Sequence, residues 1–276
     1  MALSDVTLTA GMRNNLLQLQ GTSKMMERTQ ERLSTGKQVN SALDNPTNFF
    51  AAQAHLNRAT DFSNRKDAMG ESVQQVKAGD AGITAISSLL SSAKGLVEAA
   101  AATSITTDRQ TFMTQFNTLM SQIDQLSSDS GYRGTNLLNQ GTVTVKFNED
   151  ASSKLIVSGF NATSIGLSVS QAGTAGNTDW VTGNAGLATQ SAMLDTAINQ
   201  LRAQSKSLSA NMNIITTRQT FTDSMIQTLQ SGADNLTLAD MNTEGASMLM
   251  LQTRQTLGTT ALSMSSQAAQ SLLRLF

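Results

Sequence analysis

The chain of 276 residues contains no cysteine, one histidine and one proline, and only 14% of its residues are charged. Without cysteine it has no disulfide, no thiolate metal ligand and no thiol nucleophile, whichever compartment it occupies. The histidine, His55, has no second histidine or cysteine as a co-ligand, and the nearest carboxylate, that of Asp61, lies more than one helical turn along the chain. The stretch "GDAGIT" (79–84) lacks the lysine and the preceding strand of a phosphate loop. We therefore expect no metal site, no cofactor and no enzymatic activity.

Charge and hydropathy exclude two further kinds of partner. The formal net charge of −1 leaves no excess of lysine and arginine to neutralise phosphates, so we expect no nucleic-acid partner. The sequence has no run of 18 apolar residues, so we expect no membrane insertion. Gly11, Arg13, Asn14 and Asn15 interrupt any compact apolar core of a signal peptide. If the protein leaves the cell, we expect it to be exported by another route.

Apolar residues at heptad spacing predict long helices, which a single proline leaves uninterrupted. In the first segment, alternating steps of four and three residues connect a seam with two polar positions, and Gly36 is expected to end this helix. The seam consists of Met12, Leu16, Leu19, Ser23, Met26, Gln30 and Leu33. Asn45 and Pro46 have the pattern of a helix cap followed by proline at the first helical position, so a second helix is predicted to begin at Pro46.

The second helix is predicted to continue without a break to about residue 102. Its seam repeats every seven residues through Phe62, Met69, Val76, Ile83, Leu90 and Val97. Four glycines, at 70, 79, 82 and 95, each disfavour the helix by roughly 1 kcal/mol relative to alanine, but the heptad phase passes through all of them. We therefore expect packing rather than propensity to stabilise this helix. A further amphipathic helix is predicted through residues 112–126.

Between about residues 136 and 185 the pattern changes to that of short strands and loops. Alternating apolar residues predict strands in "TVTVKF" (142–147), "KLIVSGF" (154–160) and "GLSVS" (166–170). Helical spacing then resumes, with leucine or isoleucine every seven residues. This seam consists of Leu187, Leu194, Leu201, Leu208 and Ile215, with Leu229 fourteen residues further on. The sequence therefore predicts a mainly α fold, an elongated antiparallel helical bundle or coiled coil with a small β-hairpin region in the middle.

The last segment, from about residue 237 to 276, is predicted to be a helix that is apolar on most of its faces. Between Gly245 and Phe276 only Arg254 and Arg274 are charged. Two arrangements are compatible with this pattern: a monomeric helical bundle, or a subunit that self-associates through both of its ends. The second accounts for the apolar surface that a pair of terminal helices would leave uncovered. The candidate self-assembly residues are Leu16, Leu19, Met26, Leu33, Met248, Leu251, Leu257, Leu262, Leu272, Leu273, Leu275 and Phe276.

Three motifs, in the same order along the chain, resemble those of bacterial flagellin, the subunit of the flagellar filament. They are "RLSTGKQVNSALDN" (32–45), "DSGYRGTNLL" (129–138) and "LQTRQTLGTTALSMSSQAAQSLLRLF" (251–276). The resemblance implies a structural subunit that polymerises into a helical filament and transmits motor torque for swimming motility. Because only about fifty residues separate the helical halves, it implies a short form without large outer domains. Asn45 and Pro46 stand where the family usually has Asp and Ala, so the junction between helices is expected to bend at a different angle.

The resemblance also implies domains, partners and a location. Residues 1–44 with 234–276 would pair as an inner-tube coiled coil, and residues 45–233 would form an outer helical bundle with a β-region at about 139–185. Gly36, Asn40, Asn45 and Pro46 would form the inter-domain junction. Expected partners are copies of the same chain, flagellar junction and cap proteins, an export chaperone and the type III flagellar export apparatus. The expected location is the extracellular flagellar filament, reached without a cleaved signal peptide.

Two alternatives remain open at this point. One is a flagellar hook-filament junction protein, which would share the terminal helices. The other is a secreted binding module that uses the region 139–185, although no convergent cluster of polar residues favours it there.

Overall fold

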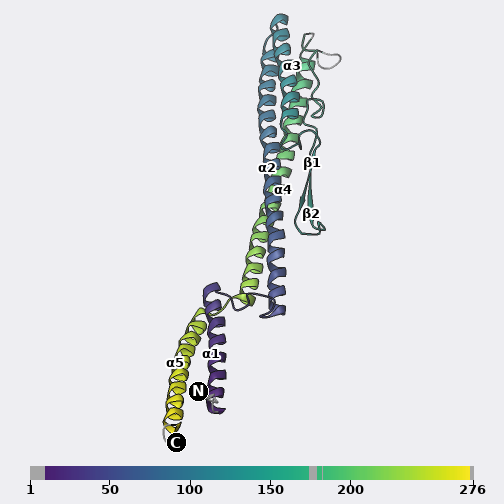
Figure 1. Cartoon of the computed structure of the whole chain (residues 1–276). Helices are drawn as coiled ribbons and strands as arrows, with labels where there is room; N and C mark the ends of the chain where they lie inside the picture. Colours follow the sequence, from purple (N-terminus) through teal and green to yellow (C-terminus); the bar gives the residue numbers. More distant parts are fainter. Residues whose placement is uncertain (1–9, 174–178, 182, 274–276) are drawn as a thin grey trace. The chain divides into compact units, whose positions relative to one another are not determined.

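The computed structural model describes residues 10–173, 179–181 and 183–273, and the described part is mainly helical (Figure 1). In chain order the elements are α1 (Ala10–Thr35), α2 (Pro46–Ala102), α3 (Thr106–Asp129), β1 (Thr142–Lys146), β2 (Lys154–Ser158), α4 (Asn184–Thr237) and α5 (Met241–Leu273). The predicted fold class, helices with a small β-hairpin between them, is confirmed. The chain divides into two compact units, one of Met1–Arg58 with Thr228–Phe276 and one of Ala59–Gln227, and each is described by itself.

Helix α2 runs from Pro46 to Ala102 without a break, as its heptad phase predicted. All six residues of the predicted seam are buried, and Met69 and Leu90 have no exposed surface. Gly82 in this helix has close neighbours: a Cβ at this position would lie 2.5 Å from Leu138 Cδ1 and 2.5 Å from Ser130 Oγ. Glycine is therefore needed at this position because the segment after α3 packs directly against the α2 backbone.

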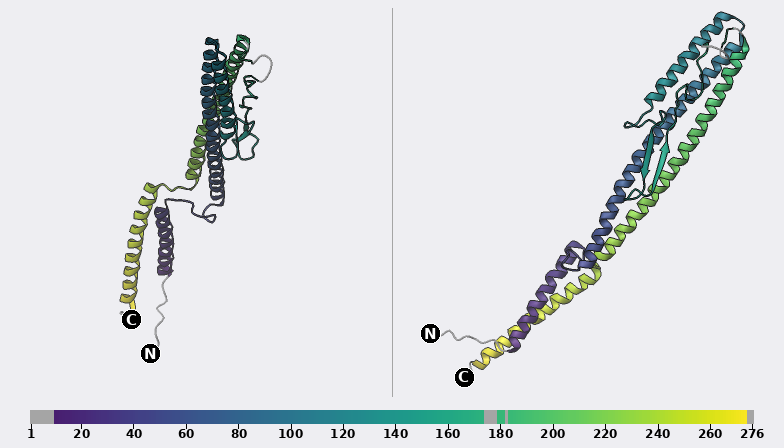
Figure 2. Two further views of the ribbon diagram at one scale, coloured as in Figure 1. Left: turned by 90° about the horizontal axis from the view of Figure 1, so that it is seen from above. Right: turned by 90° about the vertical axis from the view of Figure 1, so that its right-hand side faces the viewer.

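Helix α4 packs antiparallel to α2 along the unit Ala59–Gln227 (Figure 2). Contacts that pair early residues of α2 with late residues of α4 fix this direction. Lys66 Nζ lies 2.7 Å from Asp223 Oδ1, and the Ser205 hydroxyl donates to Asp80 Oδ1 at 2.7 Å. The leucines and the isoleucine of the predicted α4 seam are buried. Buried Thr222 occupies the heptad position between Ile215 and Leu229, and its hydroxyl donates to the Arg218 carbonyl at 2.8 Å.

Helix α3 and the hairpin complete the core of this unit. Strands β1 and β2 pair antiparallel, with Val143 opposite Val157, and both of these side chains are buried. The ring of Trp180 lies 5.2 Å from that of Phe116, and both rings are fully buried. Buried Arg109 connects three segments: it donates to the Thr103 carbonyl at 2.8 Å, the Trp180 carbonyl at 3.3 Å and Asn184 Oδ1 at 2.6 Å.

One of the three predicted strands is wrong. Residues 164–168 form a turn instead, and around it the Leu167 N–H donates to the Thr163 carbonyl and the Val169 N–H to the Ser164 carbonyl, both at 2.9 Å. Leu167 and Val169 are nevertheless both buried. The alternation of apolar residues therefore indicated correctly which side chains are buried. It did not indicate a strand, because the segment around this turn buries the same two side chains.

Serine and threonine hydroxyls cover much of the exposed helix surface and are satisfied within their own helix. A hydroxyl repeatedly donates to the carbonyl four residues earlier, as in Thr84 to Asp80, Ser91 to Ser87 and Thr118 to Thr114. The same bond occurs on α5, where the Thr256 hydroxyl donates to the Gln252 carbonyl at 3.0 Å. The helices thus present a polar surface that does not depend on charge.

Candidate self-assembly surface on the terminal helices

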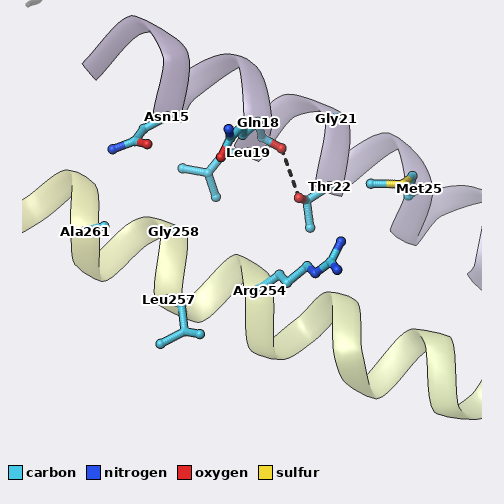
Figure 3. A pocket seen from close by; sticks show the side chains of 10 residues that line it. All are labelled: Asn15, Gln18, Leu19, Gly21, Thr22, Met25, Arg254, Leu257, Gly258 and Ala261. Atoms are coloured by element: carbon cyan, nitrogen blue, oxygen red, sulfur yellow. Dashed lines mark hydrogen bonds between the residues drawn. The ribbon is translucent and has the colours of Figure 1, made fainter. Parts of the chain in front are cut away.

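Helices α1 and α5 form an antiparallel pair within the unit of terminal segments. At one end of the pair, Arg32 Nη1 of α1 lies 2.9 Å from Glu244 Oε1 of α5. Toward the other end, Leu19 points at Gly258, where a Cβ would come within 2.8 Å of Leu19 Cδ2 (Figure 3). Gly258 therefore lets the two helices approach closely.

On α1, the side chains that face α5 follow steps of three and four residues. This series shares some residues with the predicted seam and is displaced from it by one residue at the others. The buried or half-buried series is Met12, Asn15, Leu19, Thr22, Met26, Thr29 and Leu33. The predicted seam was wrong at Leu16 and Gln30, which are exposed, and at Ser23, where Thr22 is the more buried residue. The reason is visible at Thr22: its hydroxyl donates to the Gln18 carbonyl at 2.9 Å (Figure 3), so it can be buried although it is polar.

On α5, the facing series has the same spacing. It consists of Glu244, Met248, Leu251, Gln255, Gly258, Leu262 and Ser265. Leu251 is the most buried of these, with 7% of its surface exposed. Six of the candidate self-assembly residues are therefore at least half-buried within one chain, namely Leu19, Met26, Leu33, Met248, Leu251 and Leu262.

Other apolar side chains of the pair are exposed. Leu16 and Leu257 were among the candidates, whereas Leu17, Met25, Met241, Leu249, Met250 and Met264 were not. Met250, Leu257 and Met264 recur every seven residues, and we call these three residues the outer stripe. Leu257 precedes the seam residue Gly258 by one position, about 100° around the helix, so the outer stripe lies beside the seam, at the edge of the contact between α1 and α5. In Figure 3 the Leu257 side chain projects from α5 away from α1. The regular spacing in the sequence was the signal that would have identified this stripe.

Four candidates cannot be placed by their side chains. Leu275 and Phe276 lie outside the described residues, and Leu272 and Leu273 end α5 with side chains that are likewise not described. Their part in self-assembly stays a prediction.

Two shallow grooves run between α1 and α5. The first has a volume of about 620 Å³, and Leu19, Met25, Arg254 and Leu257 are among its lining residues (Figure 3). The second, of about 490 Å³, is lined among others by Met25, Arg28, Arg32, Glu244 and Met250. Both combine apolar walls with guanidinium groups, so they suit the side chains of a protein surface better than a small reactive molecule.

Neither a metal site nor a membrane span is found in the described part of the chain. No group of three or more acidic or histidine side chains gathers there to hold an ion. Within the same residues, none of the helices has the length and hydropathy needed to cross a bilayer.

The predicted junction residues lie where the chain leaves α1 and enters α2. Gly36 has a φ of +70°, its N–H donates to the Arg32 carbonyl at 2.8 Å, and its carbonyl accepts from the Ala239 N–H at 3.0 Å. This left-handed conformation after the last helical residue favours glycine. The Gln38 N–H donates to the Thr237 carbonyl at 2.7 Å, so the segments after α1 and before α5 are joined by backbone hydrogen bonds.

Capping at the start of α2 follows the sequence prediction. Asn45 Oδ1 accepts from the Asn48 N–H at 3.1 Å, and Pro46 is the first helical residue. In the preceding turn, Asp44 Oδ2 accepts from the Ser41 N–H at 3.0 Å and the Asn40 N–H at 3.1 Å. These backbone hydrogen bonds, with that of Ser41 first, hold the pKa of Asp44 below its ordinary value of 3.8.

Asp240 caps α5 in the same way. Its Oδ2 accepts from the Thr243 hydroxyl at 3.0 Å, and its Oδ1 accepts from the Asn242 N–H at 2.9 Å and the Thr243 N–H at 3.3 Å. The hydroxyl of Thr243 is the largest cause that lowers the pKa of Asp240, followed by the two backbone N–H groups.

Comparison with known proteins identifies similar chains over the full length of this one. The family described as "Bacterial flagellin N-terminal helical region" matches residues 7–143. Flagellin FljK of Caulobacter vibrioides is 28% identical over 279 residues, which cover 100% of both chains. A flagellin of Brucella melitensis is 28% identical over 266 residues, which cover 94% of both chains. A crystal structure of Bacillus cereus flagellin covers 56% of this chain and 88% of its own, with 17% identity and a TM-score of 0.47.

Proposed function

Because this chain belongs to the bacterial flagellin family, we propose that the exposed apolar side chains of α1 and α5 are the surface through which its copies polymerise into the flagellar filament. The observation that supports this proposal is the outer stripe. The seam between α1 and α5 is filled by other side chains, and Leu257 still has 64% of its surface exposed. A neighbouring copy that covers this surface would gain about 25 cal/mol for each Å² of apolar area removed from water.

A filament requires only that this contact be heterologous and not close into a ring. The outer stripe and the exposed side chains of α1, such as Leu17, are different surfaces of one pair. A contact between two different surfaces repeats from copy to copy and builds an open helical polymer. In this arrangement residues 1–44 and 234–276 belong to the inner tube of the filament, and residues 45–233 to the outer layer.

The finer partners and the location follow from the same proposal. The subunit reaches the extracellular filament through the flagellum's own type III export apparatus, accompanied by an export chaperone. Within the filament it meets junction and cap proteins at the two ends. A subunit of the hook-filament junction would instead give assemblies of limited length.

The test replaces one apolar residue of the outer stripe with a charge. Leu257→Glu is compared with Gln252→Glu, a change at another exposed position of α5 outside the outer stripe that adds the same charge. We expect Leu257→Glu to remain in the supernatant under conditions in which the wild type and Gln252→Glu sediment as filaments, with negative-stain microscopy as the second readout. Long filaments from Leu257→Glu at the wild-type concentration would contradict the proposed surface.

A further inference from the structure

We propose that the exposed methionines of α1 and α5 are oxidation sites, at which peroxide forms methionine sulfoxide and prevents free subunits from assembling. The proposal rests on the assembly surface proposed above. It adds to that surface a modification chemistry and a class of reagent.

The distribution of methionine exposure carries the inference. Met25 is 48% exposed, Met241 47%, Met250 56% and Met264 65%. All four lie on α1 or α5, whereas every other methionine whose side chain is described is buried or half-buried. In the unit Ala59–Gln227, for example, Met69 and Met120 have no exposed surface. Exposure to an aqueous oxidant is therefore concentrated on the helix pair that is proposed to assemble.

Their positions relate these sulfur atoms to the proposed contact. Met25 from α1 and Met250 from α5 line the same groove of about 490 Å³, together with buried Leu251 and Thr29. Met250 and Met264 are two of the three residues of the outer stripe. Three of the four exposed thioethers thus lie where a neighbouring copy would cover them.

The reaction needs only a two-electron oxidant such as hydrogen peroxide. A lone pair on the thioether sulfur attacks one peroxide oxygen, the O–O bond breaks, and the second oxygen leaves as water after proton transfer. The sulfur gains one oxygen and is oxidised by two electrons, while the peroxide is reduced by two. No protein nucleophile or metal takes part, so exposure selects the site.

Oxidation makes these side chains more costly to bury in a contact between copies. A flexible apolar thioether becomes a polar sulfoxide with a strong hydrogen-bond acceptor. When a neighbouring copy covers this group, the acceptor loses water without gaining a partner. We expect sulfoxide at these positions to raise the subunit concentration needed for polymerisation by about tenfold. Assembled filaments should oxidise more slowly at Met25, Met250 and Met264, because the neighbouring copy covers the sulfur atoms.

The experiment uses full-length subunits treated with hydrogen peroxide before polymerisation. Peptide mapping by mass spectrometry measures sulfoxide at each methionine, and sedimentation after seeding with filament fragments measures assembly. One variant carries Met25→Leu, Met241→Leu, Met250→Leu and Met264→Leu, and the control carries Met69→Leu and Met120→Leu in the core. Leucine keeps the volume and apolar character of methionine, so both variants should fold.

At a subunit concentration just above the threshold of the untreated wild type, we expect peroxide to block assembly of the wild type and of the core control, and to leave the surface variant competent. Methionine sulfoxide reductase should restore assembly of the oxidised wild type, a readout that requires no substitution. If the wild type assembles normally with sulfoxide mapped at all four positions, or if the surface variant loses assembly as the wild type does, the proposal is overturned. If either of these results is obtained while Leu257→Glu still prevents assembly, the proposed oxidation sites are contradicted and the proposed assembly surface is not. Normal filaments from Leu257→Glu would remove the assembly surface itself.

Discussion

Replacing Gly82 with alanine tests how closely the segment after α3 packs on α2. A Cβ at this position would lie 2.5 Å from Leu138 Cδ1, 2.5 Å from Ser130 Oγ and 2.9 Å from Ser130 Cβ. Leu138 is fully buried, and the Ser130 hydroxyl donates to the Leu126 carbonyl at 2.6 Å. Moving Leu138 would disturb the core, and moving the Ser130 hydroxyl would break its hydrogen bond. Overpacking of this kind costs about 1 to 3 kcal/mol.

Gly95 supplies the matched control on the same helix, because a Cβ there meets nothing within 4 Å. Alanine stabilises a helix interior by roughly 1 kcal/mol relative to glycine at either position. We therefore expect Gly95→Ala to raise the free energy of unfolding by roughly 1 kcal/mol. For Gly82→Ala the overpacking cost offsets this gain, so we expect the free energy of unfolding to fall by between about 0 and 2 kcal/mol. The helix contribution cancels in the difference between the variants, which isolates the overpacking cost of about 1 to 3 kcal/mol.

Urea denaturation of the subunit, followed by circular dichroism, measures both variants. The urea concentration at the unfolding midpoint should rise for Gly95→Ala. For Gly82→Ala this midpoint should lie below that of Gly95→Ala, and the free energy of unfolding should depend on urea concentration with the same slope in both variants. If Gly82→Ala proved as stable as Gly95→Ala, the close approach of Leu138 and Ser130 to the α2 backbone would be refuted.

Two other expectations concern single polar groups. Arg109→Met removes three hydrogen bonds that join Thr103, Trp180 and Asn184, and we expect it to lower the free energy of unfolding by about 1 to 3 kcal/mol in the same urea experiment; an unchanged midpoint would contradict the role assigned to this arginine. Asp240→Ala removes the cap of α5 and should speed amide hydrogen exchange at the start of that helix. Because the folded pKa of Asp240 is lowered, its stabilisation is present above the ordinary value of 3.8 and is lost as the pH falls through the folded value. Acid should therefore lower the protection factors of the same amides, the ratio of intrinsic to observed exchange rate, in the wild type and have little further effect on them in Asp240→Ala.

The long helices of the unit Ala59–Gln227 could be predicted from sequence because their seams are almost entirely apolar. A heptad phase that persists through Gly70, Gly79, Gly82 and Gly95 outweighed the propensity of those residues. The strand predicted over residues 166–170 failed for a related reason. Alternation reports burial, and burial alone does not distinguish a strand from a turn.

The α1 seam was harder to predict because apolar residues mark only part of it. Thr22 and Thr29 are buried against α5, whereas Leu16 and Leu17 are exposed. A threonine that donates to its own helix costs little to bury, so the side facing α5 and the side facing water carry similar residues. The apolar character of the whole pair was predictable, but which side of α1 faces α5 required the structure.

The hydroxyl groups bonded to their own helices have a consequence for ionic strength. Only 14% of residues are charged, and the surface hydroxyls, such as those of Thr84, Ser91 and Thr256, are already satisfied by carbonyls of the same helix. Salt screens charges but leaves such neutral hydrogen bonds unchanged. Copies of this chain can therefore lie side by side without the mutual repulsion of crowded like charges, in dilute fresh water as in brine.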